Sequence, residues 1–435
     1  MNRDEPWRAW PPRVRHIRHL RVVLLAAALL GVACSSTSGT ASTSGAASTN
    51  GPAGGTAVGT APGTAPGAPP GTTATAAATV EQFAGTAEDF YKVPIPLPAA
   101  APGTLIRTMP VDAPAGEAGL RIMYHSTDDR GRDRAVTGVL YHPTTAPPAG
   151  GWPIVAWAHG TSGLAAACAP SRKPSAPPAF GVQGVRVATD YIGLGPEGEV
   201  HPYLSAAAEG HAVIDSVVAA RNLPQTGAGT EWLVAGVSQG GHAALVTSEQ
   251  AAQRLPDVRL VGTVAIAPGS QLGETYGDDL QARIITAMVL VGIEADDPSV
   301  HPSDYLSAAA LPAADLIRTK CVQDIIGSAL PLSMAPDFYT VDPRTSPLGK
   351  AWLAKNDPGQ VKADAPLLLV QGGKDLLVLP PRTAALFQRL CALGQVVQQL
   401  AIPEGTHDTV TNLAKDQIVP WVAARFAGQP ATNDC

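Results

Sequence analysis

The sequence predicts an α/β fold: a mostly parallel sheet with helices on both faces and a helical cap insertion. Short continuous apolar runs alternate with helical stretches through much of the chain, a pattern typical of parallel strands buried on both faces. Two earlier strands, at 120–126 and 135–142, are joined by a polar turn and predict an antiparallel edge. Between Pro268 and Asp364 the strand rhythm stops. An insertion of that length is more typical of a cap than of a plain loop, with a separate small domain as the alternative.

The N-terminus is predicted to be an export signal over residues 1–33. Its six arginines outnumber Asp4 and Glu5, and the apolar run at 22–33 is too short to span a bilayer comfortably. Cys34 follows directly after small residues, which resembles a bacterial lipoprotein signal with Cys34 as the lipidated residue. Ordinary cleavage nearby and free secretion is the alternative. The sequence thus predicts an exported protein, either a cell-envelope lipoprotein anchored to the membrane through Cys34 or a secreted one.

Composition separates a tether from a folded domain. Residues 34–80 consist mainly of Ser, Thr, Gly, Ala and Pro and carry no charged side chain, so we expect a disordered tether. The folded domain is predicted over 81–435, with its cap insertion at about 270–362. The net charge is −6 although the signal is basic, so this domain is acidic. An acidic domain offers phosphates no basic face, which argues against nucleic acid as a partner.

The elements of the domain follow in order along the chain. After the two early strands, six apolar runs are predicted as strands: 154–158, 185–188, 232–235, 260–266, 367–370 and 396–402. Four stretches between or after them are predicted as helices: 206–222, 241–254, 382–393 and 413–426.

Ser238 is the candidate nucleophile, in the stretch Gly-Val-Ser-Gln-Gly over 236–240. A serine on a tight strand-to-helix turn needs small neighbours, and the turn lifts its Oγ clear of the sheet. The pattern alone is weak in a chain rich in Gly and Ser. A strand before it and a helix after it favour the nucleophile over an accidental loop.

A serine nucleophile needs a base, and the base needs a carboxylate to orient it. Three histidines lie beyond Ser238. His242 lies in the helix that follows directly and is considered below, His301 falls in the predicted cap, and His407 follows the last predicted strand. Asp375 ends the preceding strand in a Gly-rich turn and is the predicted orienting acid. Asp408 is adjacent to His407 and is expected to face away from its ring, and Asp364 lies before the strand.

Acyl transfer also needs donors aimed at the developing oxyanion. The backbone N–H of Gln239 is the first candidate, and the Thr161 amide, in the loop after the strand at 154–158, is the second. His159 is expected to be a structural hydrogen-bonding residue of that loop. His242, just inside the helix after Ser238, is expected to be a packing residue.

The cysteines suggest disulfides and no metal. If Cys34 carries lipid, four remain: Cys168, Cys321, Cys391 and Cys435. An even number in an exported chain favours two disulfides, with three pairings open. The spacings contain no CxxC and no Cys/His cluster, so a zinc site is not expected.

Taken together, these residues resemble the secretory lipase family of α/β-hydrolases, the lipase A type. The matching stretches include Trp-Ala-His-Gly-Thr at 157–161, Cys-Ala-Pro-Ser at 168–171, Asp-Tyr-Ile-Gly-Leu-Gly at 190–195, the Ser238 turn and Gly-Thr-His at 405–407. The resemblance implies an α/β-hydrolase fold with a cap between the sixth and seventh core strands. It implies hydrolysis of triacylglycerols or other acyl esters without a cofactor, and the disulfides Cys168–Cys321 and Cys391–Cys435.

We therefore expect a serine carboxylic-ester hydrolase, a lipase or esterase, that acts on an acyl-ester or lipid substrate through an acyl-enzyme at Ser238. Three alternatives stay open at this point: a cell-envelope acyltransferase, a serine peptidase of the same fold, and a non-catalytic lipid-binding module.

Overall fold

The structure is a computed structural model that describes residues 80–274 and 280–435. The predicted signal peptide, Cys34 and all but the last residue of the predicted tether lie outside the described residues.

The core is a ten-stranded sheet in the order β1-β2-β3-β4-β6-β5-β7-β8-β9-β10. The pairs β2–β3, β3–β4 and β4–β6 are antiparallel. The pair β1–β2 and all pairs from β6 to β10 are parallel. The strands are β1 Glu81–Gln82, β2 Leu105–Val111, β3 Glu117–Thr127, β4 Asp133–Pro143, β5 Trp152–Ala158, β6 Val185–Thr189, β7 Ala228–Val237, β8 Arg259–Ile266, β9 Leu367–Gly372 and β10 Val397–Ile402.

The antiparallel end of the sheet differs from the prediction. The predicted hairpin forms as β3 and β4, but it is not the edge, because β2 and the two-residue β1 pair beyond β3. Strand β2 has no clear apolar run, since Arg107 and Pro110 interrupt it. Pairing with the long strand β3, rather than its own pattern, makes this segment a strand.

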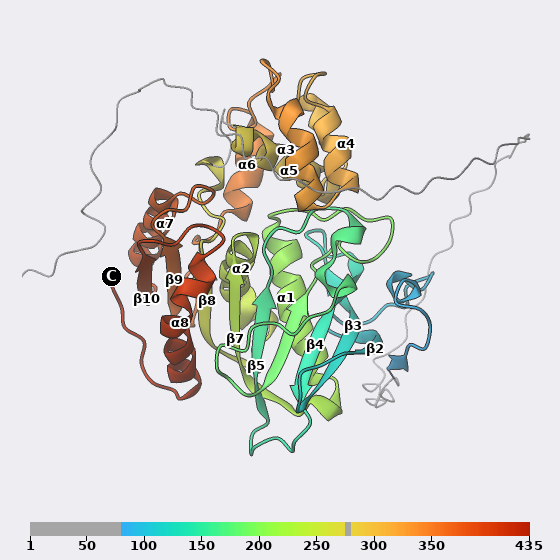
Figure 1. The fold of residues 1–435 in the computed structure, drawn as a ribbon, viewed down its shortest axis with the longest axis vertical. Helices are drawn as coiled ribbons and strands as arrows, with labels where there is room; N and C mark the ends of the chain where they lie inside the picture. The colour runs from blue at the N-terminus through green and yellow to red at the C-terminus, as the bar shows by residue number, and fades with distance from the viewer. Residues whose placement is uncertain (1–79, 275–279) are drawn as a thin grey trace, which may run out of the picture. The chain divides into compact units, whose positions relative to one another are not determined.

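Helices cover both faces of the sheet, as Figure 1 shows. They are α1 Ala206–Arg221, α2 Gln239–Arg254, α7 Pro380–Ala392 and α8 Val410–Phe426. Residues of β7 alternate between the two faces: Trp232 and Val234 pack in the cluster that includes α1, and Leu233 and Ala235 in the cluster that includes α8. The predicted fold class, an α/β fold with a mostly parallel sheet, is confirmed.

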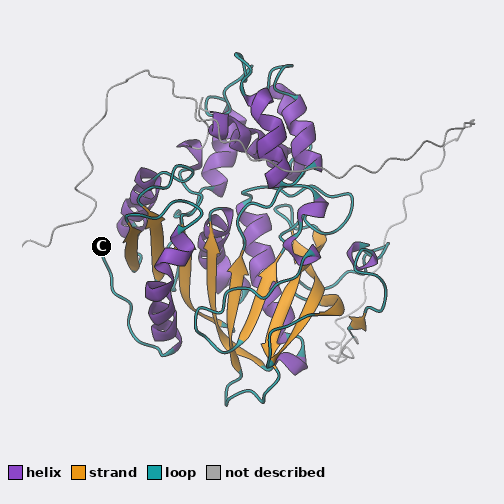
Figure 2. Cartoon of the chain, in the orientation of Figure 1, coloured by secondary structure: helices purple, strands orange, loops and turns teal. Residues whose placement is uncertain are grey.

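In the described residues, four α-helices lie between β8 and β9, which are the sixth and seventh strands counted from β3. They are α3 Leu280–Asp296, α4 Pro312–Thr319, α5 Val322–Ser333 and α6 Pro347–Asn356. Their buried side chains form a cluster of their own that also takes in Tyr203 and Leu204 of the core. Figures 1 and 2 show this cap above the edge toward which the parallel strands point. Six short 3-10 helices complete the described elements: Asp89–Tyr91, Ala166–Cys168, Pro170–Arg172, Pro224–Thr226, Leu272–Glu274 and Pro302–Asp304.

Two disulfides are present, with the pairings that the family resemblance implies. Cys168, in the loop after β5, is bonded to Cys321 at the start of α5, so this bond ties core to cap. Cys391, in α7, is bonded to the C-terminal Cys435.

Removing the core-to-cap disulfide is expected to destabilise the protein more than removing the other. The Cys168–Cys321 bond closes a loop of 153 residues and the Cys391–Cys435 bond one of 44. Because chain entropy lost by the unfolded state grows with loop length, we expect losses of about 5 and about 4 kcal/mol for the two double Cys→Ser variants. Guanidinium unfolding monitored by tryptophan fluorescence checks the order, and a larger loss for the C-terminal pair would contradict it.

A half-buried carboxylate holds the segment that returns from the cap to β9. Glu249 of α2 accepts a hydrogen bond from the Gly359 N–H at 2.5 Å. Burial, only partly offset by that bond, raises the pKa of Glu249 from 4.5 to about 7. Because the folded pKa lies above the unfolded one, the stability linked to this group is complete below about pH 4.5 and is lost as the pH rises through 7.

The variant Glu249→Gln is therefore expected to be more stable than the original at alkaline pH only. The amide keeps an oxygen acceptor for Gly359 and does not ionise, so we expect a gain of about 2 kcal/mol in unfolding free energy at pH 8 and none at pH 4. Urea unfolding of both proteins at the two pH values measures the difference. An equal difference at both values would contradict the linkage.

Candidate active site

Ser238 lies on the turn between β7 and α2, with the backbone angles φ 60° and ψ −118°. These angles are strained for a residue with a side chain, and strain of this kind is typical of functional turns. The flanking glycines explain how the turn closes. A Cβ at Gly236 would lie 2.1 Å from the Gly240 carbonyl oxygen, and one at Gly240 would lie 1.9 Å from that of Ala158. The small residues of the motif are thus required by backbone contacts.

Asp375 and His407 meet at the carboxyl edge of the sheet, after β9 and β10 respectively. His407 Nδ1 lies 2.8 Å from Asp375 Oδ2. The other carboxylate oxygen, Oδ1, accepts hydrogen bonds from the backbone N–H groups of Leu377 at 2.8 Å and Val378 at 2.9 Å. Asp375 is buried, with 1% of the residue exposed. Both oxygens of its carboxylate are hydrogen-bonded, which fixes the carboxylate in place. With Asp375 bound at Nδ1, the Nε2 atom of His407 is the one left to act as a base.

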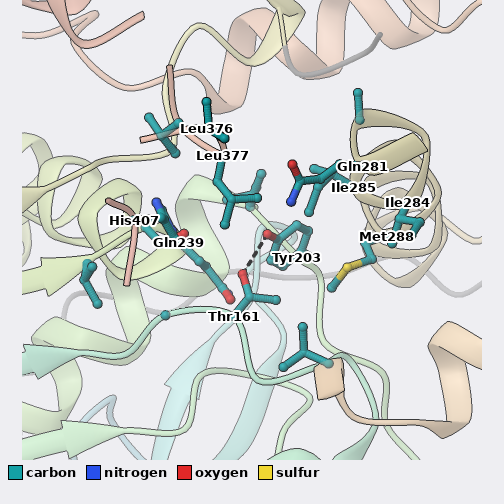
Figure 3. Close-up of a pocket in the computed structure, with 18 of the residues that line it drawn as sticks. Thr161, Tyr203, Gln239, Gln281, Ile284, Ile285, Met288, Leu376, Leu377 and His407 are labelled. Carbon is teal, nitrogen blue, oxygen red and sulfur yellow. Dashed lines mark hydrogen bonds between the residues drawn. The ribbon is translucent and has the colours of Figure 1, made fainter. Parts of the chain in front are cut away.

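Ser238 and His407 line one cavity of about 670 Å³, together with Thr161 and Gln239. Figure 3 shows His407, Thr161 and Gln239 in this cavity. Its other walls are largely apolar and come from α3, α5 and the loop after Asp375. They include Ile284, Ile285, Met288, Ile325, Ile326, Leu376 and Leu377. Asp408 also lines this cavity, but the carboxylate bonded to His407 Nδ1 is that of Asp375.

The two predicted oxyanion donors come from different elements, and both line the cavity that Ser238 lines. Gln239 is the first residue of α2, so its N–H has no acceptor within the helix. Thr161 follows Gly160, whose carbonyl oxygen lies 2.7 Å from His159 Nδ1. In a trans peptide the N–H points opposite to the C=O, so a bond that holds the Gly160 carbonyl also sets the direction of the Thr161 N–H. His159 is thus the structural hydrogen-bonding residue that its position predicts.

The loop that carries Thr161 is also fastened to the cap. The Val322 N–H of α5 donates to the Ser162 carbonyl oxygen at 2.9 Å, and the Cys168–Cys321 disulfide lies beside Gly163. Any displacement of α5 is therefore expected to reach the Thr161 amide.

Thr161 and Tyr203 form a hydroxyl pair inside the cavity that the sequence did not single out. Thr161 Oγ1 and Tyr203 Oη are 2.9 Å apart, as the dashed line in Figure 3 shows. Burial raises the pKa of Tyr203 well above its ordinary value, so its hydroxyl stays protonated and remains a donor at neutral pH.

His242 differs from the prediction of a plain packing residue. It is fully buried, but its Nδ1 lies 2.6 Å from Oε2 of Glu209, which is also fully buried. Sequence reasoning missed Glu209 as well. Glu209 could have been singled out from the sequence, because it lies among mostly small and apolar residues in the first turn of a helix. A charged side chain on a buried helix face needs a partner, so such a residue predicts a buried ion pair or hydrogen bond.

Within residues 80–274 and 280–435, no three or more His, Cys, Asp and Glu side chains are arranged to hold a metal ion. In the same part of the chain, no helix combines the length and the apolar character needed to cross a membrane.

Solved structures with a similar fold are lipases and esterases. The rice cell wall degrading esterase LipA of Xanthomonas oryzae is 19% identical, with 76% of this chain and 100% of that chain covered and a TM-score of 0.64. Lipase A of Candida antarctica is 17% identical, with 80% and 87% covered and a TM-score of 0.66. At these identities the likeness shows the fold, which is that of α/β-hydrolases.

A curated relative and a family model agree with this fold. A probable inactive lipase of Mycobacterium tuberculosis (strain CDC 1551 / Oshkosh) is 21% identical over 374 residues, with 80% of this chain and 83% of that protein covered. The secretory lipase family model matches residues 181–434, more than half of the chain. Family and fold support a hydrolase of ester substrates, and the family and the disulfides are consistent with an exported protein. The chain belongs to the secretory lipase family.

Proposed function

We propose that the chain is a serine carboxylic-ester hydrolase that cleaves acyl esters, triacylglycerols among them, through an acyl-enzyme at Ser238. The hydrogen bond between Asp375 and His407 carries the proposal, because it orients a histidine in the cavity that Ser238 also lines. A nucleophile, a base and an acid that follow in the order of this fold favour catalysis over simple binding.

In the proposed mechanism the Ser238 Oγ attacks the ester carbonyl carbon while His407 Nε2 takes its proton. The Thr161 and Gln239 amides donate to the oxygen that becomes negative. Asp375 keeps the Nδ1–H of His407 in place and stabilises the imidazolium. His407 then protonates the departing alcohol, and water cleaves the acyl-enzyme by the same steps in reverse.

The apolar lining of the cavity supports an acyl substrate. Most of the side chains that α3 and α5 contribute to it are apolar, among them Ile284, Met288 and Ile325, and they suit an acyl chain better than a peptide or a sugar. Gln281 and Gln323 are the polar side chains that these two helices add. Release of acid from tributyrin and from triolein, followed in a pH-stat, tests the proposal and compares chain lengths. A protein that releases acid from neither, and from no p-nitrophenyl ester, refutes it.

A non-catalytic lipid-binding protein is the second candidate, favoured by the name of the Mycobacterium tuberculosis relative, which is described as a probable inactive lipase. The two candidates differ in their reaction with a p-nitrophenyl phosphonate: an activated serine bonds to its phosphorus and displaces p-nitrophenolate, and an inert serine does not react.

We also propose that the protein is anchored to the cell envelope by a lipid on Cys34, on the strength of the signal sequence. Expressed in a bacterial host that processes lipoproteins, the full chain should enter the detergent phase of a Triton X-114 extraction, and Cys34→Ser should stay in the aqueous phase. Aqueous partitioning of both would favour free secretion.

A further inference from the structure

A buried polar cluster lies directly beneath the Ser238 turn. Its members are Gln239 and His242 of α2, Glu209 of α1, and His201 of the preceding loop, and all are at most 2% exposed. The Gln239 side-chain nitrogen, Nε2, donates to Glu209 Oε1 at 2.8 Å and lies 2.7 Å from His201 Nε2. Glu209 Oε2 lies 2.6 Å from His242 Nδ1.

The contacts define the charge of His242. Its Nδ1 faces the Glu209 carboxylate, and its Nε2 lies 2.8 Å from the backbone carbonyl of Asn356. Both partners only accept hydrogen bonds, so both ring nitrogens must carry a proton and the ring is an imidazolium. Asn356 is the last residue of α6, and the C-terminal end of a helix favours a positive charge.

Glu209 and His242 shift each other's pKa in the direction that keeps both charged. Burial alone lowers the pKa of His242, but the Glu209 charge and the hydrogen bonds outweigh it and raise that pKa. Burial alone raises the pKa of Glu209, but the charge of His242 and its hydrogen bond outweigh burial and bring that pKa down to about 2. Glu209 is therefore a carboxylate across the working pH range.

His201 completes the hold on Gln239. The His201 Nδ1 lies 2.7 Å from the Ile192 carbonyl oxygen and must donate to it, so in the neutral ring Nε2 accepts from the Gln239 amide. Both hydrogens of the Gln239 side-chain amide are thus engaged, and the side chain is fixed between α1 and the loop before it.

We propose that Glu209, with its charge balanced by His242, is a positioning residue that fixes the Gln239 peptide and so aims its N–H at the oxyanion. The inference rests on the proposed function. A bare carboxylate beside the oxyanion hole would oppose the negative charge that develops there, and the imidazolium of His242 cancels this repulsion. The pair therefore supplies a rigid acceptor for Gln239 without a net negative charge.

The second predicted oxyanion donor, the Thr161 N–H, is supported by side chains that pack against the same buried cluster. The ring of His201 stacks on Tyr191, with 5.5 Å between ring centroids, and Tyr191 contacts the His159 ring at 4.4 Å. His159 holds the Gly160 carbonyl, which sets the direction of the Thr161 N–H. The two halves of the oxyanion hole are thus supported by one buried cluster.

The test replaces Glu209 by leucine, which removes the acceptor, and by glutamine, which keeps an oxygen for Gln239. We expect Glu209→Leu to lower kcat on p-nitrophenyl butyrate by about 10- to 100-fold with KM within about twofold. Glu209→Gln should recover most of that loss. The second readout is the inhibition constant of an alkyl trifluoromethyl ketone, whose carbonyl carbon bonds to Ser238 Oγ while its oxygen becomes the oxyanion. This constant should rise by the factor by which kcat/KM falls.

Asp215 offers a matched control. It is the other buried carboxylate of α1 paired with α2, and its Oδ1 accepts from Arg254 Nε at 2.9 Å. Arg254 is the last residue of α2 and lies at the opposite end of that helix from Ser238. Asp215→Leu should lower Tm as Glu209→Leu does, but leave kcat and the ketone inhibition within about twofold of the original. If Glu209→Leu does not fold, Gln239→Leu decides, because it removes the other partner and should lower kcat and raise the ketone constant equally.

Three results would overturn the proposal. The first is a Glu209→Leu variant, or failing that a Gln239→Leu variant, with unchanged kcat. The second is a ketone constant that does not follow kcat/KM. The third is an Asp215→Leu variant as slow as Glu209→Leu. An original protein with no esterase activity and no reaction with phosphonate refutes the proposed function itself, whereas an active one with an unaffected variant refutes only the positioning.

Discussion

Replacing Ser238 with alanine is expected to reduce kcat on p-nitrophenyl butyrate by about 10⁴- to 10⁶-fold, because no acyl-enzyme can form without the Oγ nucleophile. Binding and the oxyanion donors remain and account for the residual rate. The release of p-nitrophenol in the steady state measures the effect. KM should change little, because the apolar cavity that holds the acyl group is left intact.

Ser248→Ala is the matched control for this prediction. Ser248 is a buried serine of the same helix α2, and its hydroxyl donates to the Leu245 carbonyl oxygen within the helix. Its loss should leave kcat within about twofold, since it is far along the helix from the turn. Comparable turnover by Ser238→Ala and Ser248→Ala would exclude Ser238 as the nucleophile.

Asp375→Asn is expected to lower kcat by about 10⁴-fold with the shape of the site preserved. The asparagine can present its NH₂ group to His407 Nδ1, which then takes the tautomer with its proton on Nε2. That tautomer cannot accept the Ser238 proton. Steady-state kinetics and the melting temperature together separate this effect from a loss of folding.

The neighbouring carboxylate gives the control for Asp375. Asp408 lines the same cavity and adjoins His407 in sequence, but the bond to Nδ1 comes from Asp375. Asp408→Asn should therefore change kcat by only a few-fold. A larger loss for Asp408→Asn than for Asp375→Asn would reassign the orienting acid.

Much of the parallel half of the fold was predictable because its strands carry their own signal. Buried on both faces, strands such as β8 and β9 read as continuous apolar runs, and their bounds differ little from the predicted ones. Strand β2 lacked this signal, since Arg107 and Pro110 break its run and its partner β3 determines its conformation. The arrangement of the cap helices depends on packing between them, which a single sequence does not encode locally.

Some residues of the candidate site were likewise predictable from the sequence and others were not. Ser238, Asp375 and His407 could be named because each follows a recognisable strand, and parallel strands bring such positions to one edge. The Glu209–His242 pair and the Thr161–Tyr203 pair could not. Each joins residues more than thirty positions apart, and only the packing of α1 against α2, or of the loop before α1 against the loop after β5, brings them together.

Active-site titration with a p-nitrophenyl alkylphosphonate tests the central claim most directly. We expect one equivalent of p-nitrophenol released per protein, loss of esterase activity in parallel, and a single phosphonylated residue, Ser238, in the peptide mass map. Label on another residue, or full labelling of Ser238→Ala, would contradict it.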